Sequence, residues 1–194
     1  MRSIEFSRDT KETKVSIAFN VDGSGRAEIA TGVGFLDHML TLFAVHGFFD
    51  LKIEAQGDLH VDYHHTVEDV GICLGLAISR ALGDFKGIRR YGFSIIPMEE
   101  ALARAAVDIC NRPHLVFQAD FPTEKVGAFD TELVEEFFRA VVVNSCVTLH
   151  LKVEYGRNSH HMAEALFKAF GRAMDQATGL DQRLDDVLSS KGVL

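Results

Sequence analysis

Residues 64–68 read His-His-Thr-Val-Glu, and residues 160–164 repeat the pattern as His-His-Met-Ala-Glu. Each copy of this HHxxE motif is followed by apolar residues at helical spacing, so each motif is predicted to open a helix. Adjacent side chains on a helix point roughly 100° apart, whereas residues three and four apart share a face. Each Glu is therefore expected beside one His of its pair, while the two His diverge toward different centres.

The paired motifs predict a site for two metal ions. One His from each pair can meet at one ion, and the remaining two His can meet at a second ion. Imidazole and carboxylate ligands without thiolate suit a borderline divalent ion such as Mn, Fe, Ni or Zn, and they argue against a structural zinc site. Paired His at a helix start can also be solvated first-turn residues, but repetition in a matching context favours metal ligands.

The same repeat predicts an internally duplicated α+β fold. Each half would be a small mixed sheet covered on one face by two helices, with the halves packed about a pseudo-twofold axis. Alternation and turn residues place the strands at 3–8, 13–20, 26–30, 49–55, 91–98, 100–109, 114–119 and 147–154. The first three of these are expected to form a β-meander. Helices are expected at 35–46, 64–82 and 130–145 and after the second motif. The stretch 84–90 is the predicted boundary inside a single domain of residues 1–194, with halves of about 1–86 and 87–194.

The composition argues against several classes of protein. The formal net charge of -8 argues against a general nucleic-acid or membrane-surface binder, so basic residues are expected to act locally. No stretch approaches the ~20 apolar residues of a membrane span, and the first residues lack the apolar segment of a signal peptide, so a cytoplasmic location is expected. Three scattered cysteines at apolar positions indicate reduced core residues rather than a disulfide framework.

Aligning the halves through their motifs adds two candidate ligands. His38 lies 26 residues before His64, and Glu136 lies 24 residues before His160. Both positions begin similar apolar runs, so pseudo-symmetry nominates both side chains. A satisfied core histidine is the alternative for His38. Glu135 and a plain solvated helix face compete with Glu136.

Several basic residues are candidates for binding an anion. In an acidic protein, arginines and lysines near a metal site would suit a phosphate held by charge-assisted contacts. The candidates are Arg89, Arg90, Arg112, Lys168 and Lys191.

Six short motifs together resemble one known family. They are GFLDHML at 34–40, DYHHTVED at 62–69, TLH at 148–150, NSHH at 158–161, FKA at 167–169 and SKG at 190–192. The chain is similar, nearly end to end, to the imidazoleglycerol-phosphate dehydratases of histidine biosynthesis. The resemblance implies loss of water from imidazole glycerol phosphate, two Mn ions per site, and a 24-subunit cage with active sites between subunits.

The resemblance also implies which residues bind the metals. One ion would be bound by His64, Glu68 and His160. The other would be bound by His38, His65, His161 and Glu164. Glu136 is a further candidate, because the family often has His at this position and a carboxylate can also bind Mn.

Substrate contacts implied by the resemblance fall on Glu12, His46, Gln56, Arg90, Arg112, Lys168, Ser190 and Lys191. Glu12, His46 and Glu164 are the catalytic candidates, and which of them is the base or the acid stays open. Taken without the resemblance, Glu12 lies in a polar connection where a solvated turn charge is the default interpretation. A second departure from the family is Cys110-Asn111, where Ser-Gly is usual.

Two other classes of protein are compatible with the motifs. A dinuclear metallohydrolase acting on a phosphate ester would also use two adjacent metals. A non-catalytic metal-storage or assembly protein would explain the His and Glu residues but not the arginines.

Overall fold

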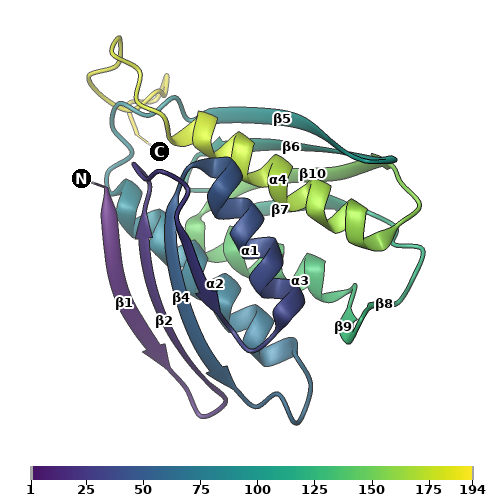
Figure 1. Cartoon of the computed structure of the whole chain (residues 1–194). Coiled ribbons are helices and arrows are strands. Elements are labelled where there is room, and N and C mark those ends of the chain that lie inside the picture. The colour runs from purple at the N-terminus through teal and green to yellow at the C-terminus, as the bar shows by residue number, and fades with distance from the viewer. Residues whose placement is uncertain (1, 194) are drawn as a thin grey trace.

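The computed structural model describes residues 2–193, within which two four-stranded sheets enclose four helices (Figure 1). The first sheet has the order β1-β2-β4-β3, formed by Ser3–Asp9, Thr13–Asn20, Asp50–Gly57 and Ala27–Ala30 respectively. The second has the order β5-β6-β10-β7, formed by Tyr91–Met98, Ala101–Ile109, Val147–Tyr155 and His114–Gln118. The helices are α1 (Gly34–Gly47), α2 (His64–Leu82), α3 (Leu133–Ser145) and α4 (Ser159–Thr178).

The two sheets share one topology. In each, the first three strands of the order pair antiparallel, and the last pairs parallel to its neighbour. Helices α1 and α2 pack on the first sheet, and α3 and α4 pack on the second. The predicted α+β class, with mixed sheets each covered by two helices, is therefore confirmed.

The predicted β-meander is wrong. Strand β3 pairs parallel with β4, at the edge of the sheet, and not with β2. Both sides of β2 are already occupied, by β1 over residues 14–20 and by β4 over residues 13–20. Consecutive strands pair in only about two-thirds of cases, and a four-residue strand suits an edge position better than a central one.

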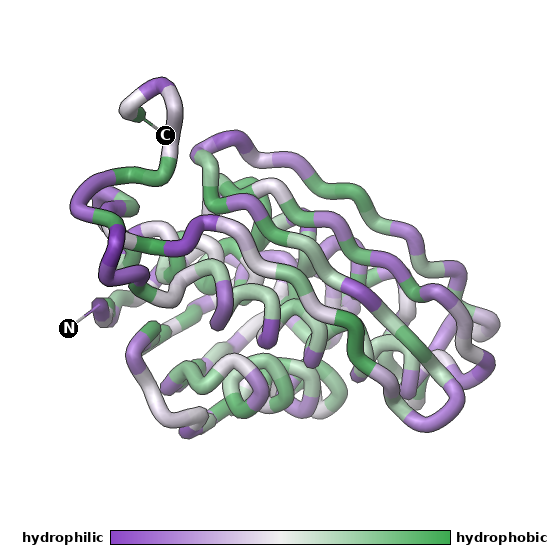
Figure 2. The backbone as a smooth tube through the Cα atoms, turned by 90° about the horizontal axis from the view of Figure 1, so that it is seen from above, coloured by the Kyte–Doolittle hydropathy of each residue, from purple (hydrophilic) through white to green (hydrophobic). Residues whose placement is uncertain are grey.

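The strands bury one face and expose the other. In β2, Val15, Ile17 and Phe19 are buried, and the residues between them are more exposed. Figure 2 shows such an alternation of hydrophilic and hydrophobic residues along the strands that face the viewer. A period of two is expected for a sheet that packs on the core with one side only. The outer faces of both sheets are consequently uncovered in the single chain.

Phenylalanines from both halves fill the space between the sheets. The rings of Phe43 on α1 and Phe170 on α4 stack with centroids 5.1 Å apart. Those of Phe138 on α3 and Phe167 on α4 lie 4.7 Å apart. Because Phe43 belongs to the first half and Phe170 to the second, the halves share one hydrophobic core.

Two glycines let helices of different halves approach closely. A Cβ atom at Gly75 would lie 2.5 Å from the carbonyl oxygen of Val141, and one at Gly171 would lie 2.8 Å from that of Phe43. Gly75 and Gly171 are 96 residues apart, which is also the separation of the two HHxxE motifs. The crossing of α2 with α3 is thus the counterpart of the crossing of α4 with α1, as a pseudo-twofold axis requires.

Three smaller features complete the description. A short hairpin of β8 (Lys125–Val126) and β9 (Phe129–Asp130) precedes α3, and its two-residue strands are too short to have been predicted from alternation. Cys73, Cys110 and Cys146 are free thiols. None of the helices in the described part of the chain is long and apolar enough to cross a membrane.

Candidate metal centre

Equivalent polar residues fix the first turns of α2 and α4. Asp62 Oδ1 accepts the backbone N–H of His64 at 2.8 Å, and Asn158 Oδ1 accepts that of His160 at 2.9 Å. Such side-chain acceptors satisfy N–H groups that have no partner inside the helix. Both HHxxE motifs therefore begin their helices as predicted.

Within each motif the two His diverge. The ring planes of His64 and His65 meet at 90°, and those of His160 and His161 at 80°. The first His of each pair faces the Glu four residues on, because residues four apart share a helix face. The Nε2 to carboxylate distances are 3.6 Å from His64 to Glu68 and 3.0 Å from His160 to Glu164.

His38, His160 and Glu164 form a candidate metal-binding group, with ligand atoms that all lie within 4.8 Å of one another. Glu164 Oε1 lies 3.0 Å from His38 Nε2 on α1 and 3.0 Å from His160 Nε2. The group joins the two halves, because α1 packs against α4. Two imidazoles that face the same carboxylate oxygen make a ligand set that suits a borderline divalent ion.

Lys168 and His46 lie on the same side of the core as this group. Lys168 Nζ donates to the second oxygen of Glu164 at 2.6 Å. Burial by itself raises the pKa of Glu164, but Lys168, His38 and His160 outweigh it and bring that pKa to about 2. The pKa of His46 is lowered by burial and by the charges of Lys168 and Arg172. The lowered pKa favours the neutral imidazole, which is the form that a general base requires.

The second His of each motif contacts a carboxylate outside the motifs. His65 Nδ1 lies 2.9 Å from Asp58 Oδ2, and its Nε2 lies 3.9 Å from Glu12 on the β1–β2 turn. His161 Nδ1 lies 2.7 Å from Glu100 Oε2. The hydrogen bond from His161 and two backbone N–H groups lower the pKa of Glu100 to about 2.

Two predicted anion-binding residues share one partner. Arg90 makes two hydrogen bonds to Asp108, at 2.6 and 3.1 Å, and Arg112 Nη2 lies 3.7 Å from Asp108 Oδ2. Arg90 Nη1 also donates to the carbonyl oxygen of Leu188 at 2.7 Å, which brings the C-terminal segment to this place. Arg90 has φ 71°, an uncommon value for a residue other than glycine, and its backbone N–H and carbonyl are both hydrogen-bonded, to Ala177 and Ile109.

The remaining predicted residues are not gathered with these groups. Glu136 Oε2 lies 3.7 Å from Arg139 Nε on α3, and no described residue completes a metal-binding group with it. Gln56 is exposed on β4, and Ser190 and Lys191 are exposed in the C-terminal segment. In a single chain His160, and not His161, lies with His38 and Glu164.

Sequence reasoning missed three carboxylates, Asp58, Glu100 and Asp108. No motif carries them, and their partners come from other elements. A signal was present only for Asp58, which lies just upstream of the first motif in a polar loop.

A pocket beside the candidate metal group is lined by aromatic side chains. Phe35, Tyr63 and Phe129 line it together with His38 and His160. The ring of Phe35 meets that of His160 edge to face, with centroids 5.3 Å apart. This wall is apolar enough to receive a planar ring next to the imidazoles.

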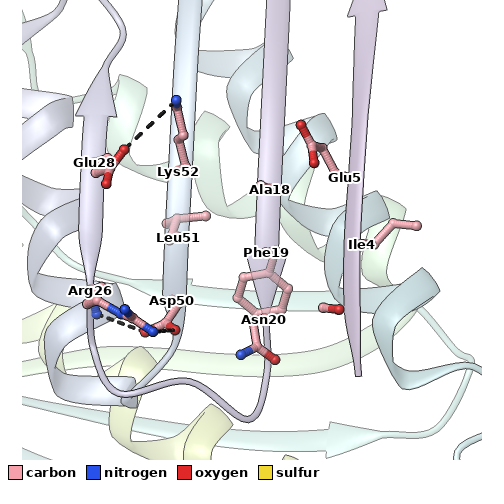
Figure 3. A pocket seen from close by; sticks show the side chains of 11 residues that line it. Ile4, Glu5, Ala18, Phe19, Asn20, Arg26, Glu28, Asp50, Leu51 and Lys52 are labelled. Carbon is pink, nitrogen blue, oxygen red and sulfur yellow. Dashed lines mark hydrogen bonds and ion pairs between the residues drawn. The ribbon is translucent and has the colours of Figure 1, made fainter. Parts of the chain in front are cut away.

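A second pocket, on the outer face of the first sheet, has no comparable chemistry (Figure 3). Each of its two cations is paired with a carboxylate, Arg26 with Asp50 at 3.1 Å and Lys52 with Glu28 at 3.9 Å. It offers no unpaired cation to an anionic ligand, and it is not part of the candidate site.

A duplicated α+β chain with His and Glu residues gathered at helix starts, and with a half-buried lysine beside them, has the features of an enzyme with a candidate metal site. Comparison with known proteins identifies its family. The family model described as imidazoleglycerol-phosphate dehydratase matches residues 31–174. The chain belongs to the imidazoleglycerol-phosphate dehydratase family, which confirms the resemblance drawn from its motifs.

Individual relatives agree over the full length. The chain is 59% identical to the imidazoleglycerol-phosphate dehydratase of Acetivibrio thermocellus over 193 residues, which cover 100% of this chain and 99% of the relative. It is 55% identical to that of Shouchella clausii, with the same coverage. The crystal structure of the Staphylococcus aureus enzyme is similar, with a TM-score of 0.84 and 47% identity over 92% of this chain and 99% of that one.

Proposed function

We propose that this chain catalyses the dehydration of D-erythro-imidazole glycerol phosphate to imidazole acetol phosphate. This reaction is a hydro-lyase step of L-histidine biosynthesis, and we place it in the cytoplasm. Full-length identity of up to 59% to dehydratases of this name is the observation that carries the proposal. The group of His38, His160 and Glu164 supports it.

Two divalent ions, proposed to be Mn, would complete the site. One would be bound by His64, Glu68 and His160. The other would be bound by His38, His65, His161 and Glu164. Such ions would supply Lewis-acid stabilisation of the negative charge that develops on the substrate's imidazole ring when the adjacent carbon loses its proton. Glu136 stays a predicted further ligand.

The chain's own residues would move the protons. The proton leaves a carbon beside the imidazole that no carbonyl acidifies, so a base positioned at that carbon is needed, together with an acid for the departing hydroxyl. His46 has a lowered pKa that favours its neutral form, which can accept a proton. Glu12 lies near His65, and Glu164 lies within the candidate metal group. These three are the proposed acid and base groups.

The phosphate of the substrate would be bound by basic residues. Arg90 and Arg112 already lie beside one carboxylate, Asp108. Arg90 also donates to the carbonyl oxygen of Leu188, in the C-terminal segment that carries Ser190 and Lys191. Arginine suits this role because its planar group binds phosphate through paired N–H groups. Lys168, Gln56 and His46 are proposed as further substrate contacts.

We further propose that each site is completed between subunits of a cage, with 24 subunits as the expected size. In one chain, His160 is engaged with His38 and Glu164, while the pair of His64 and Glu68 does not join that group. A neighbouring chain that supplies His64 would complete the set. Chelation should then shift a large assembly toward smaller species. Sedimentation with and without chelator tests this, and an active metal-bound monomer would exclude a site between subunits.

A single assay separates the three candidate functions. The Mn-loaded protein is incubated with imidazole glycerol phosphate, and the ketone product and free phosphate are both measured. A dehydratase produces the ketone and no phosphate. A metallohydrolase releases phosphate, and a metal-storage protein gives neither product, so either result would refute the proposed activity.

A further inference from the structure

The second His of each HHxxE motif is anchored by a carboxylate that belongs to neither motif. His65 Nδ1 lies 2.9 Å from Asp58 Oδ2, and His161 Nδ1 lies 2.7 Å from Glu100 Oε2. The first His of each motif uses its Nε2 instead, toward the Glu four residues on. In both halves, therefore, the first His faces the Glu of its own motif and the second His faces a carboxylate outside the motif. The two outside carboxylates come from different places in the fold.

An ionised carboxylate can only accept hydrogen bonds, so the proton of a neutral imidazole beside it must be on the nitrogen that faces it. The opposite nitrogen, Nε2, then keeps its lone pair. Histidines that bind metals usually donate their other ring N–H to a carboxylate, a carbonyl or water, which fixes both the tautomer and the ring orientation.

We infer that Asp58 and Glu100 are positioning residues, which hold His65 and His161 in the Nδ1–H tautomer and present Nε2 of each ring to a metal ion. The inference rests on the proposed function only in taking these two His as metal ligands. Neither carboxylate needs to touch metal or substrate.

Glu100 also positions the backbone around its histidine. Its Oε1 accepts the N–H groups of Arg157 at 3.1 Å and Asn158 at 2.8 Å. Asn158 in turn accepts the backbone N–H of His161 at 3.4 Å. One side chain on the β5–β6 turn therefore sets both the ring of His161 and the start of α4.

Asp58 has a simpler role. It lies in the loop between β4 and α2, and its Oδ1 is buried without a hydrogen-bond partner among residues 2–193. Its Oδ2 is the oxygen that faces His65. Replacing Asp58 therefore disturbs fewer other contacts than replacing Glu100, which makes it the cleaner of the two tests.

Asp58→Asn and Glu100→Gln keep the size of each side chain but turn one acceptor into an NH2 donor. The amide should favour the Nε2–H tautomer, which cannot bind metal through that nitrogen. Nitrogen-15 NMR of the histidine rings in the full-length, metal-free protein reads the tautomer directly. We expect Nδ1–H for His65 and His161 in the unmodified protein, and a change at His65 alone or His161 alone in the matching variant.

A Mn titration of the same proteins gives the second readout. The affinity for one of the two ions should fall about 10-fold to 100-fold, as is usual when a carboxylate behind a ligand histidine is removed. Asp58→Glu and Glu100→Asp, which keep an acceptor, should recover part of that loss. Asp9→Asn and Glu28→Gln, at exposed positions on the first sheet, are the matched controls.

Two results would overturn the inference. One is an Nε2–H tautomer at His65 and His161 in the unmodified protein, which needs no variant and so does not depend on variant folding. The other is unchanged Mn affinity in both folded variants. Neither readout involves the substrate. A protein that makes no ketone from imidazole glycerol phosphate would refute the proposed activity without altering the tautomer result.

Discussion

The charge on Glu164 is maintained by three nitrogen atoms around it. Lys168 Nζ, His38 Nε2 and His160 Nε2 all lie within 3.0 Å of its oxygens, and the pKa of the carboxyl is about 2, below its ordinary 4.5. A carboxyl with a lowered folded-state pKa stabilises the fold above its unfolded pKa, and this stabilisation is lost as the pH falls toward the folded value. The ionised form is also the one that can bind a metal ion.

Glu164→Gln should therefore change the pH dependence of stability in the metal-free protein. The difference in unfolding free energy between the unmodified protein and the variant should be largest above about pH 4.5 and shrink between pH 4.5 and 2. Denaturant unfolding at a series of pH values, at one protein concentration, measures it. Glu28→Gln on β3 is the control for loss of a glutamate. A difference that grows on acidification would show that Glu164 does not stabilise the fold through its charge.

Lys168→Met should raise the pKa of His46. Burial lowers this pKa first, and the charges of Lys168 and Arg172 lower it further, so removing one charge recovers part of the shift. Methionine keeps the apolar stem of the lysine in place. NMR titration of the His46 ring measures the change, with Lys52→Met on the outer face of the first sheet as the control. An unchanged pKa would mean that Lys168 does not influence this imidazole.

Among the secondary-structure elements, the β1–β2 hairpin is tied to the start of α2 by Asp69. Arg8 Nη1 lies 2.6 Å from Asp69 Oδ1, and Thr13 Oγ1 donates to Asp69 Oδ2. The turn between these strands carries Glu12, which faces His65 of the same helix. The last residue of the DYHHTVED motif therefore determines where a catalytic candidate lies.

Asp69→Asn should loosen this hairpin. It keeps an acceptor for Thr13 but loses the ion pair with Arg8, and Asp69 is only 12% exposed, so we expect a loss of about 1–2 kcal/mol. Denaturant unfolding measures the loss, and faster amide hydrogen exchange in the two strands would locate it. Asp9→Asn removes a surface pair with Lys14 at 3.5 Å and should cost close to nothing. Equal effects of the two substitutions would contradict a specific role for Asp69.

For the whole molecule, sites between subunits predict that two inactive variants can rescue each other. His64→Ala chains keep His160, and His160→Ala chains keep His64. When they are dissociated, mixed in equal amounts and reassembled, roughly a quarter of the sites should contain both His and regain activity, because each contributing chain has an even chance of being the intact one. Dehydratase activity before and after mixing measures this. Mixtures as inactive as their components would place both His in one chain.

Most of the correct predictions concern residues that are close to one another in the sequence. Strand alternation, the two helix starts and the divergence of adjacent His are local geometry, and they appear in the structure as expected. The place of β3 at the sheet edge depended on competition between strands for one partner. The pairing of Arg90 with Asp108 depended on the fold of the second half, which brings their strands side by side.

His38 was nominated as a ligand by counting residues back from the HHxxE motifs, because the two halves have similar spacings of 26 and 24 residues. Its distances, and the choice of His160 over His161 as the neighbour, followed only from the packing of α1 on α4. The same counting nominated Glu136, whose side chain instead pairs with Arg139. The spacing between motifs thus identifies candidate ligand positions, but the direction of a side chain such as Glu136 also depends on the charged residues near it.

The matching close crossings at Gly75 and Gly171 have a consequence for the ancestry of the chain. An ancestral gene encoding one half would have yielded a homodimer that buried the same helices, and the two HHxxE motifs of that dimer would have been identical by descent. Fusion of two gene copies would then have allowed each motif to mutate separately. His38 and Glu136, at matching positions of α1 and α3 with different chemistry, fit such a divergence. The close helix crossings would then be the contact surface that both halves kept, while each half acquired its own residues around it.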